Sequence, residues 1–446
     1  MIIVDRMLEE RELEGRPIRV ALIGAGFMAQ GLANTIANSV RGMDVAAIYG
    51  RRLDRAAGVY EYAGLGNAQV VTTQDGLDDA IRAGRPAITD DPMLICHSDQ
   101  IDALVEITGS VEFGAQVSLE AFRHGKHVIL MNAELDATIG PLLHVYARRH
   151  NVVLSACDGD EPGVQMNLVR WVRGLGLVPR VIGNVKGLQD PYRNPDTQRD
   201  FAEKWGQNPA MVTSFADGSK ISFEQTIAAN ATGFSVLSRG MSRGVPFDGS
   251  PLELPSLYDL EEVRALGGIV DYTVGPSSVK VFCLAEHSDP KQRHYLELYK
   301  LGDGPLYPFW IPYHLPTFEA PNSIARVVLL GDGLAPPLDG PSVEVCAVAK
   351  RDLTAGETLD DYGMFMTYGE AVNADEMSAQ RYLPEGLVEG CKLVRDVGKD
   401  AVLTYGDVEL PANRLADRLR AEQYRYFRGE AWLEDRLKAQ RESRAA

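Results

Sequence analysis

Three acidic side chains lie close together near the middle of the chain. The segment "VVLSACDGDEPG" places Asp158, Asp160 and Glu161 directly after a run of β-forming residues. Carboxylate oxygens are the ligands that Mg²⁺ and Mn²⁺ prefer, so these acids predict a metal site. Such an ion would hold two adjacent substrate oxygens and stabilise an alkoxide. The alternative is structural, because Asp160 or Glu161 before Pro162 fits the N-cap of a helix.

A second set of polar and basic residues lies between Lys186 and Lys220. Cations beside hydroxyl and amide groups are typical of a pocket that grips phosphate. Lys186 ends an apparent strand and Lys220 begins a helix, and such edges face a cleft, so we expect both to act in catalysis. We expect substrate contacts from Arg193, Asn194, Lys204 and Ser214. The alternative is that these charged residues lie on a solvated surface. If no metal binds, the lysines would stabilise the negative charge on the substrate oxygens.

His314, in "IPYHLPTFE", is a candidate proton donor or phosphate ligand. Imidazole titrates near neutral pH and suits either role. A single histidine is more often structural. We prefer His314 to the other histidines because it lies where the chain returns to its first domain.

A glycine-rich turn follows the first apolar run. In "IRVALIGAGFMAQGLANTIAN", Gly24, Gly26 and Ala29 fit G-x-G-x-x-A between a strand and a helix. The first glycine allows the tight turn, the second lets pyrophosphate approach the backbone, and the third small residue lets helix and strand pack closely. The helix N-terminus then attracts phosphate. We therefore predict a dinucleotide site that includes Phe27 and Met28; the alternative is a structural turn.

The end of the second strand indicates which nucleotide binds. NAD sites carry Asp or Glu there, whereas this strand ends in Gly50, Arg51 and Arg52. Two guanidiniums attract a 2′-phosphate that a carboxylate would repel, which favours NADPH. Alternatively, the arginines only solvate a loop. We also assign Thr108, Gly109, Ser110 and Asn132 to the cofactor site.

Strands and helices alternate through the first third of the chain. Apolar strands are expected at 18–24, 43–50, 103–109, 125–132 and 152–158, with helices between them. This rhythm predicts an α/β fold with a Rossmann-type, doubly wound parallel sheet over residues 1–157. An α+β catalytic domain is expected over 158–325. A small, mostly β domain that ends in one long helix is expected over 326–446.

The composition excludes several classes of protein. The chain has 446 residues, a formal net charge of −17 and five scattered cysteines. The charge disfavours nucleic acid and anionic membranes as partners, and the cysteines suggest buried thiols rather than a disulfide framework. No segment has the length and hydropathy of a signal peptide or a membrane span. We expect a cytoplasmic protein that binds a small molecule.

Several motifs resemble known enzymes. "GKHVILMNAELDATIG" resembles the nucleotide-binding domain of homoserine dehydrogenases, and "AKRDLTAGETLD" resembles a SAF-type segment. The whole chain is similar to the homoserine-dehydrogenase-like family, which includes the deoxyxylulose-phosphate-reductoisomerase-like (DRL) enzymes. This resemblance implies NADPH-dependent conversion of 1-deoxy-D-xylulose 5-phosphate, a sugar phosphate, to 2-C-methyl-D-erythritol 4-phosphate in isoprenoid synthesis by the methylerythritol phosphate pathway.

The resemblance also implies roles for particular residues. The standard reductoisomerase segment "GRKISVDSATMMNKGLE" compares with "DGSKISFEQTIAANATGF", which keeps Lys220, Ser222 and Asn230. The chain departs from that segment at Ala231 and Phe234, where a Lys and a Glu are replaced. Homoserine dehydrogenases place a catalytic Lys and Asp in an equivalent region, which here implies Lys220 and Asp217.

Other functions remain open at this point. A dehydrogenase of the homoserine type, or one acting on another hydroxy or sugar acid, would need no rearrangement and no metal. A non-catalytic sensor that binds NADPH is a third reading, although the density of Lys, Asp and Asn in the second domain argues against it. The SAF-like domain is expected to serve as an oligomer contact or a lid, or else to hold a second ligand. We expect a homo-oligomer by analogy with other dehydrogenases.

Overall fold

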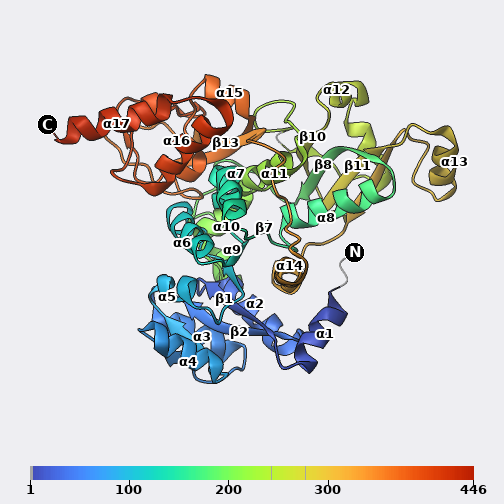
Figure 1. Ribbon diagram of the computed structural model, residues 1–446. Coiled ribbons are helices and arrows are strands. Elements are labelled where there is room, and N and C mark those ends of the chain that lie inside the picture. Colours follow the sequence, from blue (N-terminus) through green and yellow to red (C-terminus); the bar gives the residue numbers. More distant parts are fainter. Residues whose placement is uncertain (1–3, 243, 277, 446) are drawn as a thin grey trace. The chain divides into compact units, whose positions relative to one another are not determined.

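The structure is a computed structural model that describes residues 4–242, 244–276 and 278–445 (Figure 1). The chain divides into two compact units. Unit 1 comprises Met1–Gly163 and Leu315–Pro336, and unit 2 comprises Val164–His314 and Pro337–Ala446. The chain therefore leaves unit 1, returns to it for one helix and then re-enters unit 2. Most of the segments 158–325 and 326–446, which the sequence predicts as separate domains, lie in the same compact unit.

Unit 1 is built on a seven-stranded sheet in the order β3-β4-β2-β1-β5-β6-β7. Its strands pair in parallel, which confirms the predicted Rossmann-type sheet. They are β1 (Ile18–Ile23), β2 (Met43–Tyr49), β3 (Gln69–Val70), β4 (Ala87–Thr89), β5 (Ala103–Glu106), β6 (His127–Leu130) and β7 (Leu154–Ala156). The strand order reverses between β1 and β5, and ligands of such sheets bind at that point, beyond the carboxyl ends of the strands.

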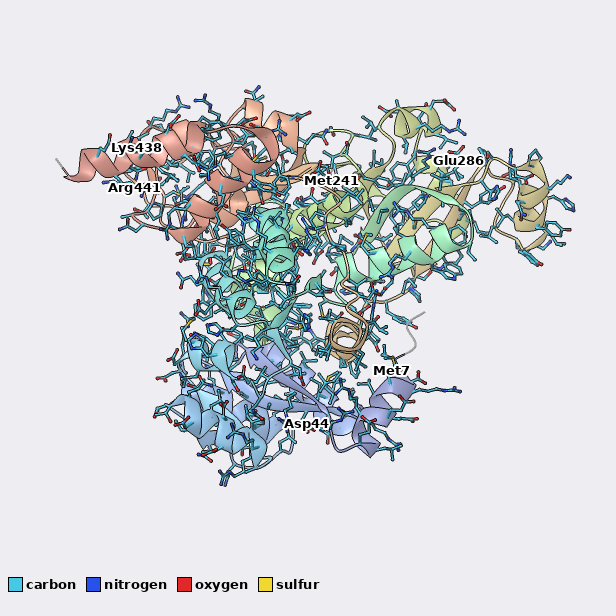
Figure 2. The ribbon with its side chains drawn as sticks, in the orientation of Figure 1. Met7, Asp44, Met241, Glu286, Lys438 and Arg441 are labelled. Atoms are coloured by element: carbon cyan, nitrogen blue, oxygen red, sulfur yellow. The ribbon has the colours of Figure 1, made fainter. Side chains whose placement is uncertain are left out.

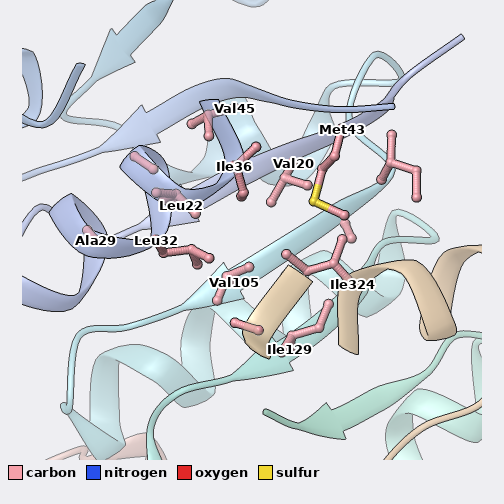
Figure 3. Close-up of a cluster of buried hydrophobic side chains, with 14 of the residues drawn as sticks. Val20, Leu22, Ala29, Leu32, Ile36, Met43, Val45, Val105, Ile129 and Ile324 are labelled. Atoms are coloured by element: carbon pink, nitrogen blue, oxygen red, sulfur yellow. The ribbon is translucent and has the colours of Figure 1, made fainter. Parts of the chain in front are cut away.

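The helices of unit 1 connect these strands, and one comes from the returning segment. They are α1 (Asp5–Leu13), α2 (Phe27–Ser39), α3 (Leu53–Tyr62), α4 (Gln74–Arg82), α5 (Pro92–His97), α6 (Val111–Arg123), α7 (Ala133–Arg149) and α14 (Pro316–Leu330). Figure 3 shows Val20 and Leu22 of β1 packed with Ile36 of α2 and Ile324 of α14. A Cβ added at Gly31 of α2 would lie 2.7 Å from the Thr317 side chain, so glycine allows this close approach.

Unit 2 contains a mixed five-stranded sheet in the order β12-β11-β8-β10-β9. Central β8 pairs in parallel with β10 and antiparallel with β11. Its strands are β8 (Val178–Lys186), β9 (Val245–Pro246), β10 (Ile269–Val274), β11 (Val281–Glu286) and β12 (Leu306–Ile311). Its helical segments are α8 (Glu161–Gly174, in unit 2 from Val164), α9 (Arg199–Trp205), α10 (Pro209–Asp217), α11 (Ser219–Thr232), a 3₁₀ segment (Pro251–Leu257), α12 (Leu260–Ala265) and α13 (Pro290–Leu298). At the end of β11, Glu286, labelled in Figure 2, accepts a hydrogen bond from Arg180 Nε at 3.0 Å.

The C-terminal part of unit 2 has short antiparallel pairs, as the sequence predicts. They are β13 (Val343–Ala349) with β14 (Thr367–Asn373) and β15 (Lys392–Leu393) with β16 (Val408–Glu409). Short helices lie at α15 (Ala374–Ala379), Glu385–Leu387 and Tyr405–Asp407. The single terminal helix is a wrong prediction. The chain forms α16 (Leu415–Arg428) and α17 (Trp432–Ala445), because Gly429 adopts a left-handed φ of 68° that ends the first helix.

Two predictions from the composition concern the cysteines and membrane-spanning helices. All five cysteines are buried and unpaired, as expected. Among the described residues, no helix is both long enough and apolar enough to span a bilayer.

Candidate functional site

The glycine-rich loop of unit 1 has the form expected for a pyrophosphate site. Gly24 has a φ of 130°, and a Cβ there would lie 3.3 Å from the Ile107 carbonyl oxygen, so glycine is required by the fold. Gly26 is the N-cap of α2, and no side chain caps that helix end. A Cβ at Gly26 would have nothing within 4 Å, so the space beside the loop is open. An uncapped helix N-terminus beside open space fits the pyrophosphate of a dinucleotide.

The rest of the turn supports this geometry. Ala29 is fully buried against β1, where the motif needs a small residue. Phe27 is 45% exposed, and Met28 is half-buried. The Gly24 N–H donates to the Tyr49 carbonyl at 3.1 Å, which ties the loop to the end of β2.

The two arginines after β2 differ in their surroundings. Both are exposed. Arg52 pairs with Asp54 through two contacts, Nε to Oδ1 at 3.1 Å and Nη2 to Oδ2 at 2.5 Å. Arg51 has no ion-pair partner among the described residues. Arg51 is therefore the guanidinium that is available for an anion without breaking an existing pair, a difference the sequence alone does not reveal.

A buried carboxylate organises the remaining cofactor residues. Glu106, at the end of β5, is fully buried and accepts hydrogen bonds from the Thr108 N–H at 3.0 Å and from the Thr108 hydroxyl. Its other oxygen accepts from Asn132 Nδ2 at 2.6 Å, and Asn132 also donates to the Ser110 carbonyl. Burial raises the pKa of Glu106 to about 7. Thr108 and Asn132 therefore both bond to Glu106, which the sequence did not single out, and Ser110 joins them through Asn132.

Of the three acids predicted as metal ligands, Asp160 and Glu161 have carboxylate oxygens within 4.8 Å of each other, whereas Asp158 is engaged by other side chains. Asp158 is 1% exposed; its Oδ2 accepts from the Ser323 hydroxyl at 2.6 Å and its Oδ1 lies 3.5 Å from Arg326 Nη1. These contacts fasten α14 to the end of β7 within unit 1. An ion at Asp158 would have to displace a buried arginine. Asp160 follows it in the loop and Glu161 begins α8, as an acidic residue at a helix start does.

In unit 2, Asp217 forms a buried ion pair with Lys350. Its Oδ2 lies 2.8 Å from Lys350 Nζ, and its Oδ1 accepts the Ser219 N–H at the start of α11. Lys350 Nζ also donates to the carbonyls of Arg193 and Met364, each at 2.8 Å. Three acceptors satisfy the ammonium group. Asp217 therefore positions the α10–α11 junction against the C-terminal segment.

A polar cavity of about 300 Å³ lies beside this junction in unit 2. Asp217, Gly218 and Ser222 form one side, and the other lining residues are Gln189, Pro191, Tyr192, Arg239, Gly240, Tyr272, Tyr368, Gly369, Glu370 and Asp400. Arg239 is its one described cation, and Arg239 Nε donates to Glu370 Oε2 at 2.8 Å. A cavity with one paired guanidinium, three carboxylates and three tyrosines suits the hydroxyl groups of a small polyol better than a doubly charged phosphate.

Most of the other predicted substrate residues make contacts within unit 2. Arg193 Nε pairs with Asp190 at 3.0 Å, and Asn194 accepts backbone N–H groups of the turn that follows it. Lys204 lies over the Trp205 ring, and the Ser214 hydroxyl donates to the Met211 carbonyl. Asn230 accepts the backbone N–H groups of Ser342 and Val343. These contacts give Asn230 a structural role at the base of β13.

The predicted catalytic residues of unit 2 lie on separate elements. Lys186 is half-buried at the end of β8, Lys220 is 7% exposed in the first turn of α11, and His314 is half-buried after β12. Lys350 and Arg239 were missed by the sequence analysis. For Lys350 a signal exists, because it ends the apolar strand "VEVCAVAK" as Lys186 ends β8.

Comparisons with known families match two consecutive parts of the chain. Residues 24–154 match the homoserine dehydrogenase NAD binding domain, and residues 159–320 match the catalytic domain of oxidoreductase DRL. Both matched models describe domains of oxidoreductases. The matches support a nicotinamide cofactor for unit 1. Neither covers the C-terminal segment, so its SAF-type character stays a prediction.

Individual relatives are distant. A homoserine dehydrogenase from Pseudomonas aeruginosa is 24% identical over 170 residues. That match covers 36% of this chain and 36% of the relative, so the chain spans about a third of the length of the curated relative it matches.

Solved structures show weak likeness. A probable dehydrogenase from Thermotoga maritima has a TM-score of 0.41 at 14% identity, covering 72% of this chain and 91% of that one. The 1-deoxy-D-xylulose 5-phosphate reductoisomerase from Zymomonas mobilis in complex with NADPH has a TM-score of 0.39 at 16% identity, covering 71% of each chain. Likeness at this level does not bear on the substrate.

Proposed function

We propose that this protein is an NADPH-dependent reductoisomerase that converts 1-deoxy-D-xylulose 5-phosphate to 2-C-methyl-D-erythritol 4-phosphate. The observation that carries the proposal is the DRL catalytic match over 159–320, directly after a nicotinamide-nucleotide-binding domain. Arg51 supports the choice of NADPH, because it lies exposed at the end of β2 with no ion-pair partner among the described residues.

The proposal gives roles to residues of each unit. The loop from Gly24 to Ala29 binds pyrophosphate, and Arg51 binds the 2′-phosphate. Bound NADPH supplies the hydride. Lys186 and Lys220 hold the substrate phosphate and stabilise oxygen anions, and His314 donates a proton. Asp217 is a positioning residue, because both its oxygens are occupied by Lys350 and Ser219.

A divalent ion is a secondary part of the proposal. Asp160 and Glu161 would hold Mg²⁺ or Mn²⁺ through their carboxylates. Asp158 does not fit that role without losing Arg326 and Ser323. Such an ion would polarise substrate oxygens.

A homoserine-type dehydrogenase is the second candidate. The NAD-binding match and the Pseudomonas aeruginosa relative favour it. Such an enzyme would oxidise or reduce an alcohol or carbonyl without moving a carbon–carbon bond.

One assay separates these candidates. The full chain is mixed with NADPH, Mg²⁺ and 1-deoxy-D-xylulose 5-phosphate, the nicotinamide absorbance is followed, and the product is identified by mass spectrometry. Methylerythritol phosphate supports the proposal. Turnover only of homoserine or another alcohol supports the second candidate, and NADPH binding without turnover of any of them contradicts both.

Matched variants test the lysine assignment. Lys220→Met is expected to lower kcat by at least about 100-fold if Lys220 stabilises an oxyanion. Lys291→Met, an exposed lysine at the start of α13, serves as the control and is expected to retain activity.

A further inference from the structure

Three metal-binding side chains meet on unit 1: His97, Glu120 and His124. Their ligand atoms all lie within 4.8 Å of one another. His97 Nε2 lies 2.9 Å and His124 Nε2 lies 3.3 Å from the same Glu120 oxygen, Oε1. The two imidazole rings lie side by side, with centroids 4.1 Å apart and a tilt of 38° between their planes. Both nitrogens therefore point at one carboxylate oxygen.

This cluster is distant from the nucleotide site. His97 is the last residue of α5, and His124 is the C-cap of α6. The N-cap of α6 is Ser110, in the predicted cofactor loop. A helix of that length separates its two ends by about 20 Å. The cluster thus lies toward the amino ends of the strands and takes no part in the proposed reaction.

The distances of the two histidine nitrogens from the shared Glu120 oxygen fit a tetrahedral ion. Zinc binds imidazole nitrogen and carboxylate oxygen at about 2.0–2.2 Å, so two ligands of one tetrahedral zinc lie about 3.3 Å apart. The two nitrogen–oxygen distances, 2.9 and 3.3 Å, are close to that value. Two nitrogens and one oxygen suit zinc and its neighbours in the first transition series rather than Mg²⁺, which prefers oxygen alone.

The surroundings hold the ligands in place while leaving access from solvent. Arg123 Nη1 lies 2.8 Å from Glu120 Oε2, which fixes the carboxylate with its other oxygen toward the histidines. Partners of this kind orient metal ligands. The side chains of His97 and His124 are 38% and 41% exposed, so an ion can enter and a water can complete its shell.

We propose that His97, Glu120 and His124 bind one Zn²⁺-type cation with a water as the fourth ligand. Binding the ion removes the proton from each Nε2 that donates to Glu120 Oε1. A neutral ring takes a proton up again at Nδ1, and a doubly protonated ring releases its Nε2 proton to solvent. The ion joins the end of α5 to the end of α6 and stabilises unit 1 by binding only its folded form.

The test uses the full chain after removal of metal with a chelator. Zinc chloride is titrated by calorimetry, and the same samples are titrated with Co²⁺, whose visible absorption reports tetrahedral nitrogen ligation. The variants are His97→Ala, His124→Ala and Glu120→Gln. His150→Ala is the matched control, because His150 is an exposed histidine that caps the C-terminus of α7 as His124 caps α6.

We expect one Zn²⁺ per chain in the wild type and in His150→Ala, with affinity at least tenfold weaker in each cluster variant. Zinc is expected to raise the thermal midpoint of the first two proteins and to leave the cluster variants nearly unchanged. Equal zinc affinity in the wild type and the cluster variants would contradict the proposal, and so would the absence of zinc binding by the wild type. The three side chains would then form only an ion-paired cluster on the surface. Glu120→Gln keeps the shape of its side chain, and unchanged NADPH affinity in all variants confirms that unit 1 is folded.

Discussion

Lys350 Nζ lies 2.8 Å from Asp217 Oδ2, and Lys350 is 6% exposed while Asp217 is fully buried. The pair joins the residue that directly follows β13, in the C-terminal segment, to the junction of α10 and α11. It lies beside the polar cavity of unit 2, which Asp217 also lines. The C-terminal segment therefore helps to build the wall of that cavity.

Removal of Lys350 is expected to destabilise unit 2. Lys350→Ala leaves the Asp217 carboxylate buried without its charge partner, which costs about 3–5 kcal/mol. Urea unfolding measured by circular dichroism would show the transition of unit 2 at lower denaturant concentration.

The double variant Lys350→Met/Asp217→Asn is the informative comparison. It removes both charges, so it is expected to recover part of the loss. Lys392→Ala, an exposed lysine in the same segment, is expected to change stability by less than about 0.5 kcal/mol. Equal stability of Lys350→Ala and the wild type would contradict the assigned role of the pair.

Two glycines of the nucleotide loop are expected to respond differently to alanine. Gly26→Ala meets nothing within 4 Å and has an ordinary φ of −97°, so the fold tolerates it. The added methyl group lies where pyrophosphate approaches, so NADPH affinity is expected to fall at least about tenfold, or about 1.4 kcal/mol. Fluorescence titration of NADPH and a thermal melt measure the two effects.

Gly24→Ala provides the contrast. At a φ of 130° a side chain is strained, and its Cβ would crowd the Ile107 carbonyl, so stability is expected to fall by about 1–3 kcal/mol. A Gly26→Ala protein that binds NADPH as the wild type does would mean that the dinucleotide lies elsewhere.

Arg51 is expected to decide between the two nicotinamide nucleotides. Arg51→Ala removes a charge-assisted contact to the 2′-phosphate, worth about 1.5–3 kcal/mol, so NADPH is expected to bind roughly 10–100-fold more weakly while NADH is little affected. Arg52→Ala is expected to have a smaller effect because Asp54 already holds Arg52. The double variant should also weaken NADPH more than NADH.

The control for this comparison is Arg55→Ala, an exposed arginine in α3. Calorimetric titration of both nucleotides into each variant gives the ratio of affinities. Equal losses for NADPH and NADH in Arg51→Ala would show that Arg51 does not contact the 2′-phosphate.

The buried Glu106 is expected to make stability depend on pH. Burial raises its pKa to about 7 from the ordinary 4.5, so between these values the folded protein binds more protons than the unfolded chain. Stability therefore falls as pH rises from about 4.5 to 7, by roughly 3 kcal/mol from this group.

Glu106→Gln is expected to reduce that slope, measured by denaturant unfolding at several pH values across the window. The slope is not abolished, because burial also raises the pKa of Asp136 to about 7. Exposed Glu61→Gln is expected to keep the wild-type slope. An unchanged slope in Glu106→Gln would mean that Glu106 is ionised throughout the window.

The nucleotide-binding half of unit 1 could be predicted from the sequence. Apolar strands, a glycine turn and a helix with small residues are specified by neighbours along the chain, because backbone sterics and close packing act over a few residues. The positions of Gly24, Gly26 and Ala29 follow from that local rule. The end of α16 at Gly429 is also specified locally, but the helix-forming residues on both sides of this glycine led to the prediction of one continuous helix.

The partners of buried charged groups were decided by the tertiary structure alone. Asp217 meets Lys350 across 133 positions of sequence, and Asp158 meets Arg326 from the returning helix. Asp158 carries the same carboxylate whether it binds a metal or an arginine. Which partner it has depends on the elements that pack beside it, and a buried charge must be paired by whatever group that packing brings within reach.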